Sequence, residues 1–180
     1  STTITVNIDS GDADSGTGAT ADLGGTFTSG SGATVASAGD DDTFNVNATT
    51  AATLTGGAGD DSFNVSANVG GTIDGGSGNE TNGDLLNVSG HATSQLLDLG
   101  NNSVSAVFGG GTNGFLNFED FNGDGVKDTL RGTSSADTFT VATENDGTFS
   151  GGSVTADFTD FSILEGVAGA DIFTFNASLT

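Results

Sequence analysis

The sequence predicts an all-β fold, a parallel β-solenoid (a β-roll or β-helix) in which each coil contains about 19 residues. Three observations lead to this prediction. A turn rich in glycine and aspartate is followed by a short apolar strand, this unit recurs along the chain, and the strand residues alternate between apolar and polar. Such a chain buries its apolar side chains inside stacked coils that lie about 4.8 Å apart.

The clearest copy of the unit is the nonapeptide at residues 56–64, GGAGDDSFN. Its glycines permit the positive φ angles of a tight turn and expose carbonyl oxygens. Asp61 supplies a hard carboxylate oxygen, and Phe63 begins a strand with its side chain directed inward. The segment therefore combines a turn, a metal ligand and a core residue.

Other copies of the nonapeptide follow at regular distances. Phe63 follows Phe44 by 19 residues, and Ile73 follows Leu54 by the same distance. Further copies lie at 39–46, at 75–88 with a polar insertion at 79–82, at 132–141 and at 166–175. Residues 128–130 precede 137–139 by nine positions, so two nonapeptides lie back to back there. The nonapeptide is thus the unit of a degenerate repeat.

A second, weaker motif fills the other half of each unit and predicts a second short strand. It occurs at 26–28, 53–56, 72–75 and 148–151. Alternation within the strands directs Phe, Leu, Ile and Val inward and Thr, Ser and Asn outward. Residues 1–36 fit less well and are expected to form one or more irregular first coils. Residues 37–180 are expected to form the solenoid, with an irregular insertion around 89–117, and the whole is expected to be a single continuous domain.

The composition agrees with this fold and restricts the function. The chain has 31 glycines and no proline, which suits frequent turns between uninterrupted strand ladders. Its net charge of −22 makes nucleic acid and anionic membranes poor partners and favours divalent cations that reduce self-repulsion. The alternative is that the acidic residues form only a solvated surface. We favour metal because the aspartates recur at one position of the repeat.

Targeting and redox signals are few. Without cysteine the chain has no disulfide framework and no thiolate metal site. No stretch approaches the roughly 20 apolar residues of a membrane span, and no signal peptide is visible at Ser1. We expect a processed form or a segment of a longer protein.

In these residues the chain resembles the hemolysin-type (RTX) calcium-binding repeat family, over about residues 37–180. The resemblance implies export as an unfolded chain, folding outside the cell on meeting Ca²⁺, and metal held between consecutive turns. Its ligands would be carbonyls at glycine positions, here Gly57 and Gly59, and the carboxylates of Asp42, Asp61, Asp84, Asp128, Asp137 and Asp171. This chain departs from the family in having one nonapeptide per 19 residues instead of two. Some of these aspartates could instead cap turns by accepting backbone N–H bonds.

Residues 120–128 contain a second calcium-like pattern. Asp120, Asn122, Asp124 and Asp128 stand at positions one, three, five and nine, with glycine at six, as in the front half of a twelve-residue calcium loop. Arg131 stands at position twelve in place of a bidentate glutamate, and no amphipathic helix flanks the loop. A helix-free calcium loop and a simple polar turn both remain open.

Little in the sequence indicates catalysis. His91 is the only histidine and lies outside any serine-histidine-aspartate pattern. Paired carboxylates would suit a glycosidase, but the Trp or Tyr platforms typical of sugar-processing clefts are missing. We therefore predict that the chain is not an enzyme.

The sequence instead favours a structural function. We expect an extracellular, calcium-stabilised building block of a bacterial surface layer, fibre or adhesin. Its partners would be further copies of itself or neighbouring repeats of a longer chain, with a cell-surface glycan as a further partner and no insertion into membranes. The alternatives are a calcium-binding accessory module of a secreted carbohydrate-active enzyme or lipase, and an ice- or glycan-binding module.

Overall fold

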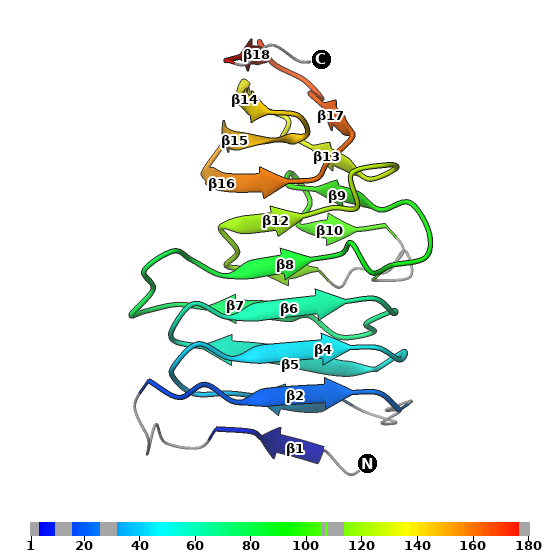
Figure 1. Cartoon of the computed structure of the whole chain (residues 1–180), viewed down its shortest axis with the longest axis vertical. Helices are drawn as coiled ribbons and strands as arrows, with labels where there is room; N and C mark the ends of the chain where they lie inside the picture. Colours follow the sequence, from blue (N-terminus) through cyan, green and yellow to red (C-terminus); the bar gives the residue numbers. More distant parts are fainter. Residues whose placement is uncertain (1–3, 10–15, 26–31, 106, 108–113, 177–180) are drawn as a thin grey trace.

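The computed structural model describes residues 4–9, 16–25, 32–105, 107 and 114–176. The predicted all-β class is confirmed, because these residues form 18 strands and no helix. The strands lie across the long axis of the molecule, and the chain climbs from β1 at one end to β18 at the other (Figure 1). Three sheets result, one wholly parallel and two that mix parallel and antiparallel pairs.

The five-stranded sheet is parallel throughout. In spatial order it contains β1 (Ile4–Asn7), β3 (Ala33–Ala36), β5 (Ala52–Gly57), β7 (Ile73–Gly76) and β11 (Phe115–Leu116). The four-stranded sheet contains β10 (Ser103–Val104), β9 (Leu96–Asp98), β13 (Thr129–Arg131) and β17 (Ile163–Glu165), and only its β10–β9 pair is antiparallel.

The nine-stranded sheet runs the length of the molecule. Its order is β18 (Ile172–Phe175), β14 (Asp137–Thr143), β15 (Asp146–Gly151), β16 (Val154–Thr159), β12 (Asp120–Asn122), β8 (Leu85–Asn87), β6 (Ser62–Val65), β4 (Thr43–Val46) and β2 (Thr20–Leu23). All of its pairs are parallel except the two that β15 makes with β14 and β16. Because β15 reverses direction between them, β14 and β18 run the same way as β2.

The predicted 19-residue step is present only in part of the chain. Phe44 lies opposite Phe63, and Leu54 opposite Ile73, each 19 residues apart. The next step, from β6 to β8, is 23 residues, because the polar insertion at 79–82 lengthens the turn. From β8 to β12 it is 35 residues and from β14 to β18 it is 34. The predicted 19-residue step therefore holds only between β3, β5 and β7 and between β4 and β6.

The segment 148–151 also departs from its predicted place. It lies in β15, antiparallel to β14 and β16, in the same sheet as Phe44 and Phe63 and not in the other half of a coil. The physical reason is local turn chemistry. Asn145 has a positive φ of 66° and Gly152 one of 59°, so each allows a tight reversal beside β15. Of the other weak motifs, 53–56 and 72–75 contribute to β5 and β7, and 26–28 lies outside the described residues.

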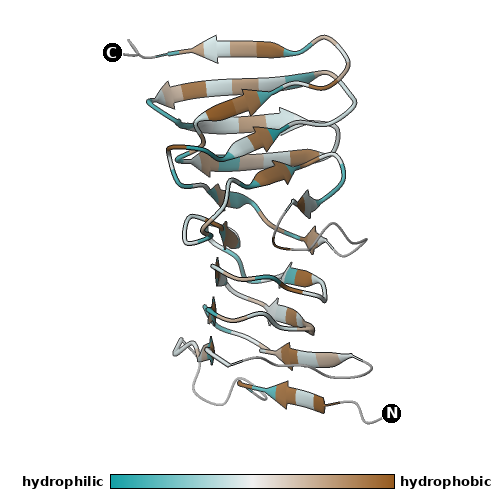
Figure 2. Cartoon of the chain, turned by 90° about the vertical axis from the view of Figure 1, so that its right-hand side faces the viewer, coloured by the Kyte–Doolittle hydropathy of each residue, from teal (hydrophilic) through white to brown (hydrophobic). Residues whose placement is uncertain are grey.

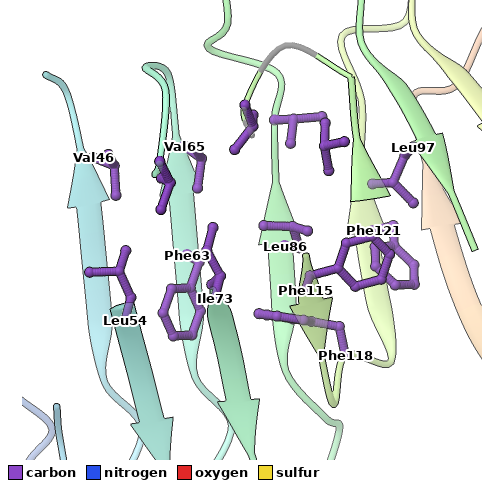
Figure 3. Close-up of a cluster of buried hydrophobic side chains, with 14 of the residues drawn as sticks. Val46, Leu54, Phe63, Val65, Ile73, Leu86, Leu97, Phe115, Phe118 and Phe121 are labelled. Atoms are coloured by element: carbon purple, nitrogen blue, oxygen red, sulfur yellow. The ribbon is translucent and has the colours of Figure 1, made fainter. Parts of the chain in front are cut away.

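The core lies between the sheets and consists of stacked apolar columns. Apolar and polar bands alternate along the strands (Figure 2), and the apolar members point inward (Figure 3). The rings of Phe44 and Phe63 stack with centroids 4.5 Å apart and planes inclined by 5°. Further along the stack, Phe115, Phe118 and Phe121 pack edge-on or tilted against one another. Parallel in-register pairing thus places like residues above one another.

An amide column on the outer face repeats the same register. The Nδ2 group of Asn45 donates to Oδ1 of Asp22 at 2.7 Å, Asn64 to Asn45 at 3.0 Å, and Asn87 to Asn64 at 3.0 Å. Asn45 and Asn64 each use both the amide donor and the amide acceptor along the column, which favours in-register stacking. The inner aromatic column and the outer amide column therefore fix β2, β4, β6 and β8 relative to one another.

Removing the ring of Phe63, inside the aromatic column, should lower the free energy of unfolding far more than removing the exposed ring of Phe175. Phe63 is fully buried between Phe44 and Phe118, so we expect Phe63→Ala to lower the free energy of unfolding by about 3–5 kcal/mol. Phe175, 57% exposed on β18, is the matched control, and we expect Phe175→Ala to cost less than about 1 kcal/mol. Urea unfolding followed by circular dichroism measures both. Equal losses would contradict the assignment of Phe63 to the core.

Candidate metal centre at the aspartate turns

The inner aspartates of the glycine turns form a ladder of hydrogen bonds between successive levels of the stack. Asp42, Asp61 and Asp84 each lie just before a strand of the nine-stranded sheet, and all three are buried. The backbone N–H of Asp42 donates to Oδ1 of Asp61 at 2.7 Å, and that of Asp61 to Oδ1 of Asp84 at 2.7 Å. The N–H of Asp84 donates to Oε2 of Glu119 at 3.1 Å. One oxygen of each bonded carboxylate thus caps the turn of the preceding level.

The same bond recurs nearer the C-terminal end. The N–H of Asp137 donates to Oδ1 of Asp171 at 3.1 Å, across β14 and β18. In the four-stranded sheet, the N–H of Gln95 donates to Oδ1 of buried Asp128 at 2.7 Å. Asp42 and Asp137 also accept backbone N–H groups, from Ala19 and Thr133. All six candidate aspartates of the repeat therefore cap turns, the alternative role that the sequence left open.

A second row of aspartates lies one residue earlier, on the outside of the same turns. Oδ1 of Asp41 accepts the N–H of Asp60 at 2.8 Å, and the carboxylate of Asp60 accepts the N–H groups of residues 81–83. Burial acts to raise the pKa of Asp60, but these hydrogen bonds outweigh it and lower the pKa. This row is not among the predicted ligands, although Asp41 and Asp60 repeat at the same 19-residue step. The outer row accepts bonds from the following level, whereas the inner row accepts them from the preceding one.

The second oxygen of the inner aspartates separates them into two groups. In Asp42 and Asp137 it accepts a hydrogen bond from within the chain, from Ser37 and Thr133 respectively. In Asp61, Asp84 and Asp128 the Oδ2 atom is buried and has no hydrogen-bond partner. A buried carboxylate oxygen without a partner is costly, so it favours either a proton or a cation at that position.

Glycine makes room for these oxygens at two successive turns. A side-chain carbon placed on Gly56 would lie 2.1 Å from Oδ2 of Asp61 and 2.2 Å from the carbonyl oxygen of Gly75. A carbon placed on Gly75 would lie 2.3 Å from Oδ2 of Asp84 and 2.2 Å from the carbonyl oxygen of Asn117. We call these two places the Asp61 cradle and the Asp84 cradle. In each, an unpartnered carboxylate oxygen and a main-chain carbonyl oxygen converge on a residue that must lack a side chain.

The two cradles fit the Ca²⁺ that the family resemblance implies. Calcium takes hard oxygen ligands, both carboxylates and backbone carbonyls, and each cradle offers one of each. Within the described part of the chain, no three or more His, Cys, Asp or Glu side chains gather as a metal-binding group. Carbonyl oxygens and water would therefore have to complete the coordination of a cation there. When bound, it would neutralise the carboxylates of Asp61 and Asp84.

The electrostatics of the cradles are those of carboxylates that lack a counter-charge. Burial raises the pKa of Asp61 to about 7, although the N–H of Asp42 opposes this, and the charge of Asp84 adds to the rise. Burial likewise raises the pKa of Asp84 to about 7, against the hydrogen bond from Asp61 and with the help of Glu80 and Glu119. Proton binding and cation binding therefore compete at these oxygens near neutral pH.

The glycine positions assigned as carbonyl ligands serve first as turn residues. Gly57 and Gly59 have φ angles of 123° and 115°, a region that L side chains rarely adopt. The carbonyl oxygen of Gly57 accepts the N–H of Ser77 at 2.8 Å, and the N–H of Gly59 donates to Gly78 at 2.9 Å. Both glycines thus join one turn to the next.

The structure does not bring the candidate ligands of residues 120–128 together. Asp120 and Asn122 lie on β12, whereas Asp128 is buried beneath the following turn. Oδ1 of Asp124 accepts the N–H groups of Val126 and Lys127 at 3.0 and 2.9 Å, and Oδ2 pairs with the Lys127 ammonium. Burial opposes ionisation, but the bonds from Lys127 and Val126 lower the pKa of Asp124 to about 2. Asp124 therefore closes a polar turn, one of the two alternatives that the sequence allows.

Asp120 faces a different neighbour. It lies in register with Asp157 on β16, and both line an outer hollow of about 320 Å³ with Asn122. Burial raises the pKa of Asp120, and the charge of Asp157 adds to the rise.

His91, the one histidine, contacts Asn68, Thr93 and Gln95 through its ring nitrogens.

Comparison with models of protein families, with curated proteins and with solved structures finds no match to this chain. Among the described residues, no helix has the length and apolar character needed to cross a membrane.

The raised pKa values predict a specific pH dependence in the absence of calcium. The folded protein keeps protons on Asp61 and Asp84 up to about pH 7, whereas the unfolded chain releases them near 3.8. The contribution of Asp61 and Asp84 to the free energy of unfolding in EGTA should therefore be fully present below about pH 4 and be lost as the pH rises through about 7. Asp61→Asn, which cannot ionise, should flatten this fall and raise stability at pH 8.

The matched control for this measurement is Glu144→Gln, which removes one negative charge at an exposed position in the β14–β15 turn. Thermal unfolding of both variants and of the unchanged chain, at pH 5 to 8 in EGTA, gives the comparison. If Glu144→Gln flattens the profile as much as Asp61→Asn does, net charge and not burial of Asp61 causes the pH dependence.

The cradles also predict which glycines tolerate a side chain. We expect Gly56→Ala to lower the free energy of unfolding by about 1–3 kcal/mol, because the new methyl group overlaps Asp61 and the main chain of Gly75. Gly24→Ala is the control, since a carbon placed there meets nothing within 4 Å, and its effect should stay within about 0.5 kcal/mol. Chemical denaturation of the two variants measures the difference, and similar values would refute the cradle geometry.

Proposed function

We propose that this chain is a calcium-stabilised structural building block of an extracellular bacterial assembly, such as a surface layer, a filament or the repeat region of an adhesin. In this proposal its strand stack is a degenerate parallel β-solenoid of the hemolysin-type repeat family. The observation that carries the proposal is an apolar strand edge at each end of the stack, paired with no further strand among the described residues.

At the C-terminal end, β18 pairs only with β14 within the described part of the chain. Its Ile172 and Phe175 are 56% and 57% exposed. The ring of Phe173 stacks on Phe139 at 4.9 Å, as Phe44 stacks on Phe63, but it has no further described ring beyond it. Ile163 of β17 is also exposed. Apolar edges of this kind are sites for pairing with another chain.

At the N-terminal end, β1 and β2 are the edges of their sheets. Ile4 and Val6 of β1 are exposed, and Ala21 of β2 is the small inward residue at that level. Because β2 and β18 run in the same direction, the N-terminal edge of one copy can continue the sheet of the next in parallel. Such pairing would set Ala21 against Phe173 and would extend the stack without limit, as heterologous contacts do.

The proposed role of calcium follows from the negative charge of the chain. A chain of net charge −22 repels its own copies, so assembly needs counter-ions. The Asp61 and Asp84 cradles supply buried oxygens that a divalent cation would satisfy, and the resemblance to secreted calcium-binding repeats supports the same ion and an extracellular setting. Because these oxygens lie inside the strand stack of a single chain, the cation would stabilise each building block and not only the contact between copies.

The experiment is assembly of the 180-residue chain with and without Ca²⁺, followed by light scattering and electron microscopy. We expect elongated particles in Ca²⁺ and dispersal in EGTA. Phe175→Lys, which places a charge on the β18 edge, should raise the concentration needed for assembly about tenfold, an effect of about 1.4 kcal/mol. Val126→Lys, at a residue 81% exposed in a turn, is the matched control and should assemble as the unchanged chain does.

Two results would overturn the proposal. One is equal assembly of Phe175→Lys and Val126→Lys. The other is a monodisperse monomer at all concentrations in Ca²⁺. If such a monomer were retained on a polysaccharide or on ice, the accessory-module or glycan- and ice-binding alternatives would take precedence.

A further inference from the structure

The inner aspartates do not have equal need of a cation. At Asp42, Asp61 and Asp84, one carboxylate oxygen accepts a backbone N–H from another turn. What differs is the second oxygen, and the difference follows from one residue of each turn. The inference drawn from this difference rests on the proposed calcium-dependent function, and it specifies which turns require the ion.

At Asp42 a hydroxyl group stands where the Asp61 cradle has only a glycine. Ala36 pairs with Thr55 in register, so the next residues, Ser37 and Gly56, occupy the same position in consecutive levels. The hydroxyl of Ser37 donates to Oδ2 of Asp42. Oδ1 of Asp42 accepts the N–H of Ala19, so both oxygens have donors from the chain itself.

At Asp137 a threonine does the same. The N–H of Thr133 donates to Oδ2 of Asp137 at 2.7 Å, and its hydroxyl donates to Oδ1 at 2.7 Å. Both groups are buried. This carboxylate is therefore fully hydrogen-bonded without a cation, although Gly132 beside it provides the same space that Gly56 provides for Asp61.

At Asp61 and Asp84 no donor takes this place. Their side chains are 1% and 0% exposed, their Oδ2 atoms have no partner, and the neighbouring atom in each cradle is a carbonyl oxygen, which repels a carboxylate. A positive ion between the two oxygens reverses this repulsion, whereas a hydroxyl would need a side chain that the cradle has no room for. Asp128 also has an unpartnered Oδ2, but a carbon on Gly123 would meet Asp160 and Phe161 before that oxygen.

We propose that hydrogen bonds from Ser37 and Thr133 take the place of the cation, so that the ladder has ion-requiring levels at Asp61 and Asp84 and ion-independent levels at Asp42 and Asp137. Calcium binding is then confined to the middle of the stack. Removal of calcium loosens β6 and β8 while β4 and β14 stay paired. The residue that folds against the second carboxylate oxygen decides whether a level depends on the ion: Ser37 at Asp42, Gly56 at Asp61, Gly75 at Asp84 and Thr133 at Asp137.

The test is the Ca²⁺ stoichiometry of the full 180-residue chain, measured by isothermal titration calorimetry with CaCl₂, in variants that first show an unchanged circular dichroism spectrum in Ca²⁺. Asp61→Asn should lower the number of bound ions by one relative to the unchanged chain, and Asp42→Asn should not lower it. Ser37→Gly, which recreates the Gly56 arrangement at Asp42, should add one ion. Ser37→Ala, which removes the donor but keeps the side-chain carbon, should add none.

Hydrogen exchange in EGTA provides a readout that does not depend on counting ions. We expect the amides of 62–65 and 85–87 to exchange at least tenfold faster in EGTA than in Ca²⁺, and those of 43–46 and 138–141 to change less than twofold. In Ser37→Gly the segment 43–46 should become calcium-sensitive as well.

Loss of one ion in Asp42→Asn, or a Ser37→Gly chain that gains no ion and keeps 43–46 insensitive to calcium, would overturn the inference and leave the proposed function intact. An unchanged chain that binds no Ca²⁺ would overturn the inference together with the calcium part of the proposed function.

Discussion

The hydrogen bond from the backbone of one aspartate to the carboxylate of the next is the interaction on which the regular part of this structure depends. It joins Asp42 to Asp61 and Asp61 to Asp84 at 2.7 Å, in a place shielded from water. In such surroundings a charge-assisted bond is strong, and a missing one is costly. It fixes each turn above the next, so the phenylalanine column inside and the asparagine column outside are brought into register by the same constraint.

This hydrogen bond leaves a second carboxylate oxygen to be satisfied, and that need links the fold to the proposed function. At Asp42, Asp61 and Asp84 the backbone N–H of a neighbouring turn satisfies one of the two carboxylate oxygens. The other oxygen needs a hydroxyl, a proton or a cation. Ser37 supplies a hydroxyl at Asp42, and Thr133 bonds both oxygens of Asp137, whereas Asp61 and Asp84 have only glycine and carbonyl groups beside them. This strongly acidic chain therefore has buried carboxylates whose effect on the stability of the fold depends on the pH and on the cations in solution.

The ladder is continuous only where the chain path is regular. Between β8 and β12 the step lengthens to 35 residues, and the acceptor for Asp84 becomes Glu119 instead of an aspartate. Beyond it the meander β14–β15–β16 widens the nine-stranded sheet by antiparallel pairing, and the ladder resumes from Asp137 to Asp171. The two ladder segments thus flank an irregular middle in which Phe115, Phe118 and Phe121 pack edge-on or tilted against one another.

The sequence by itself determined the all-β class, the position of the glycine turns and the inward direction of residues such as Phe44 and Phe63. These features depend on a few adjacent residues: glycine at positive φ, and alternation along a strand. It also contained the step of 19 that relates Asp41 to Asp60, which predicts the outer row. Only the tertiary structure decided that 148–151 pairs antiparallel, although its local pattern equals that of 53–56, because strand pairing depends on which distant segment the turns bring near. Only the tertiary structure, likewise, decided whether the second oxygen of an aspartate has a hydrogen-bond donor, because Asp42 and Asp61 have the same local sequence role and differ in the residue, Ser37 or Gly56, that folds against that oxygen.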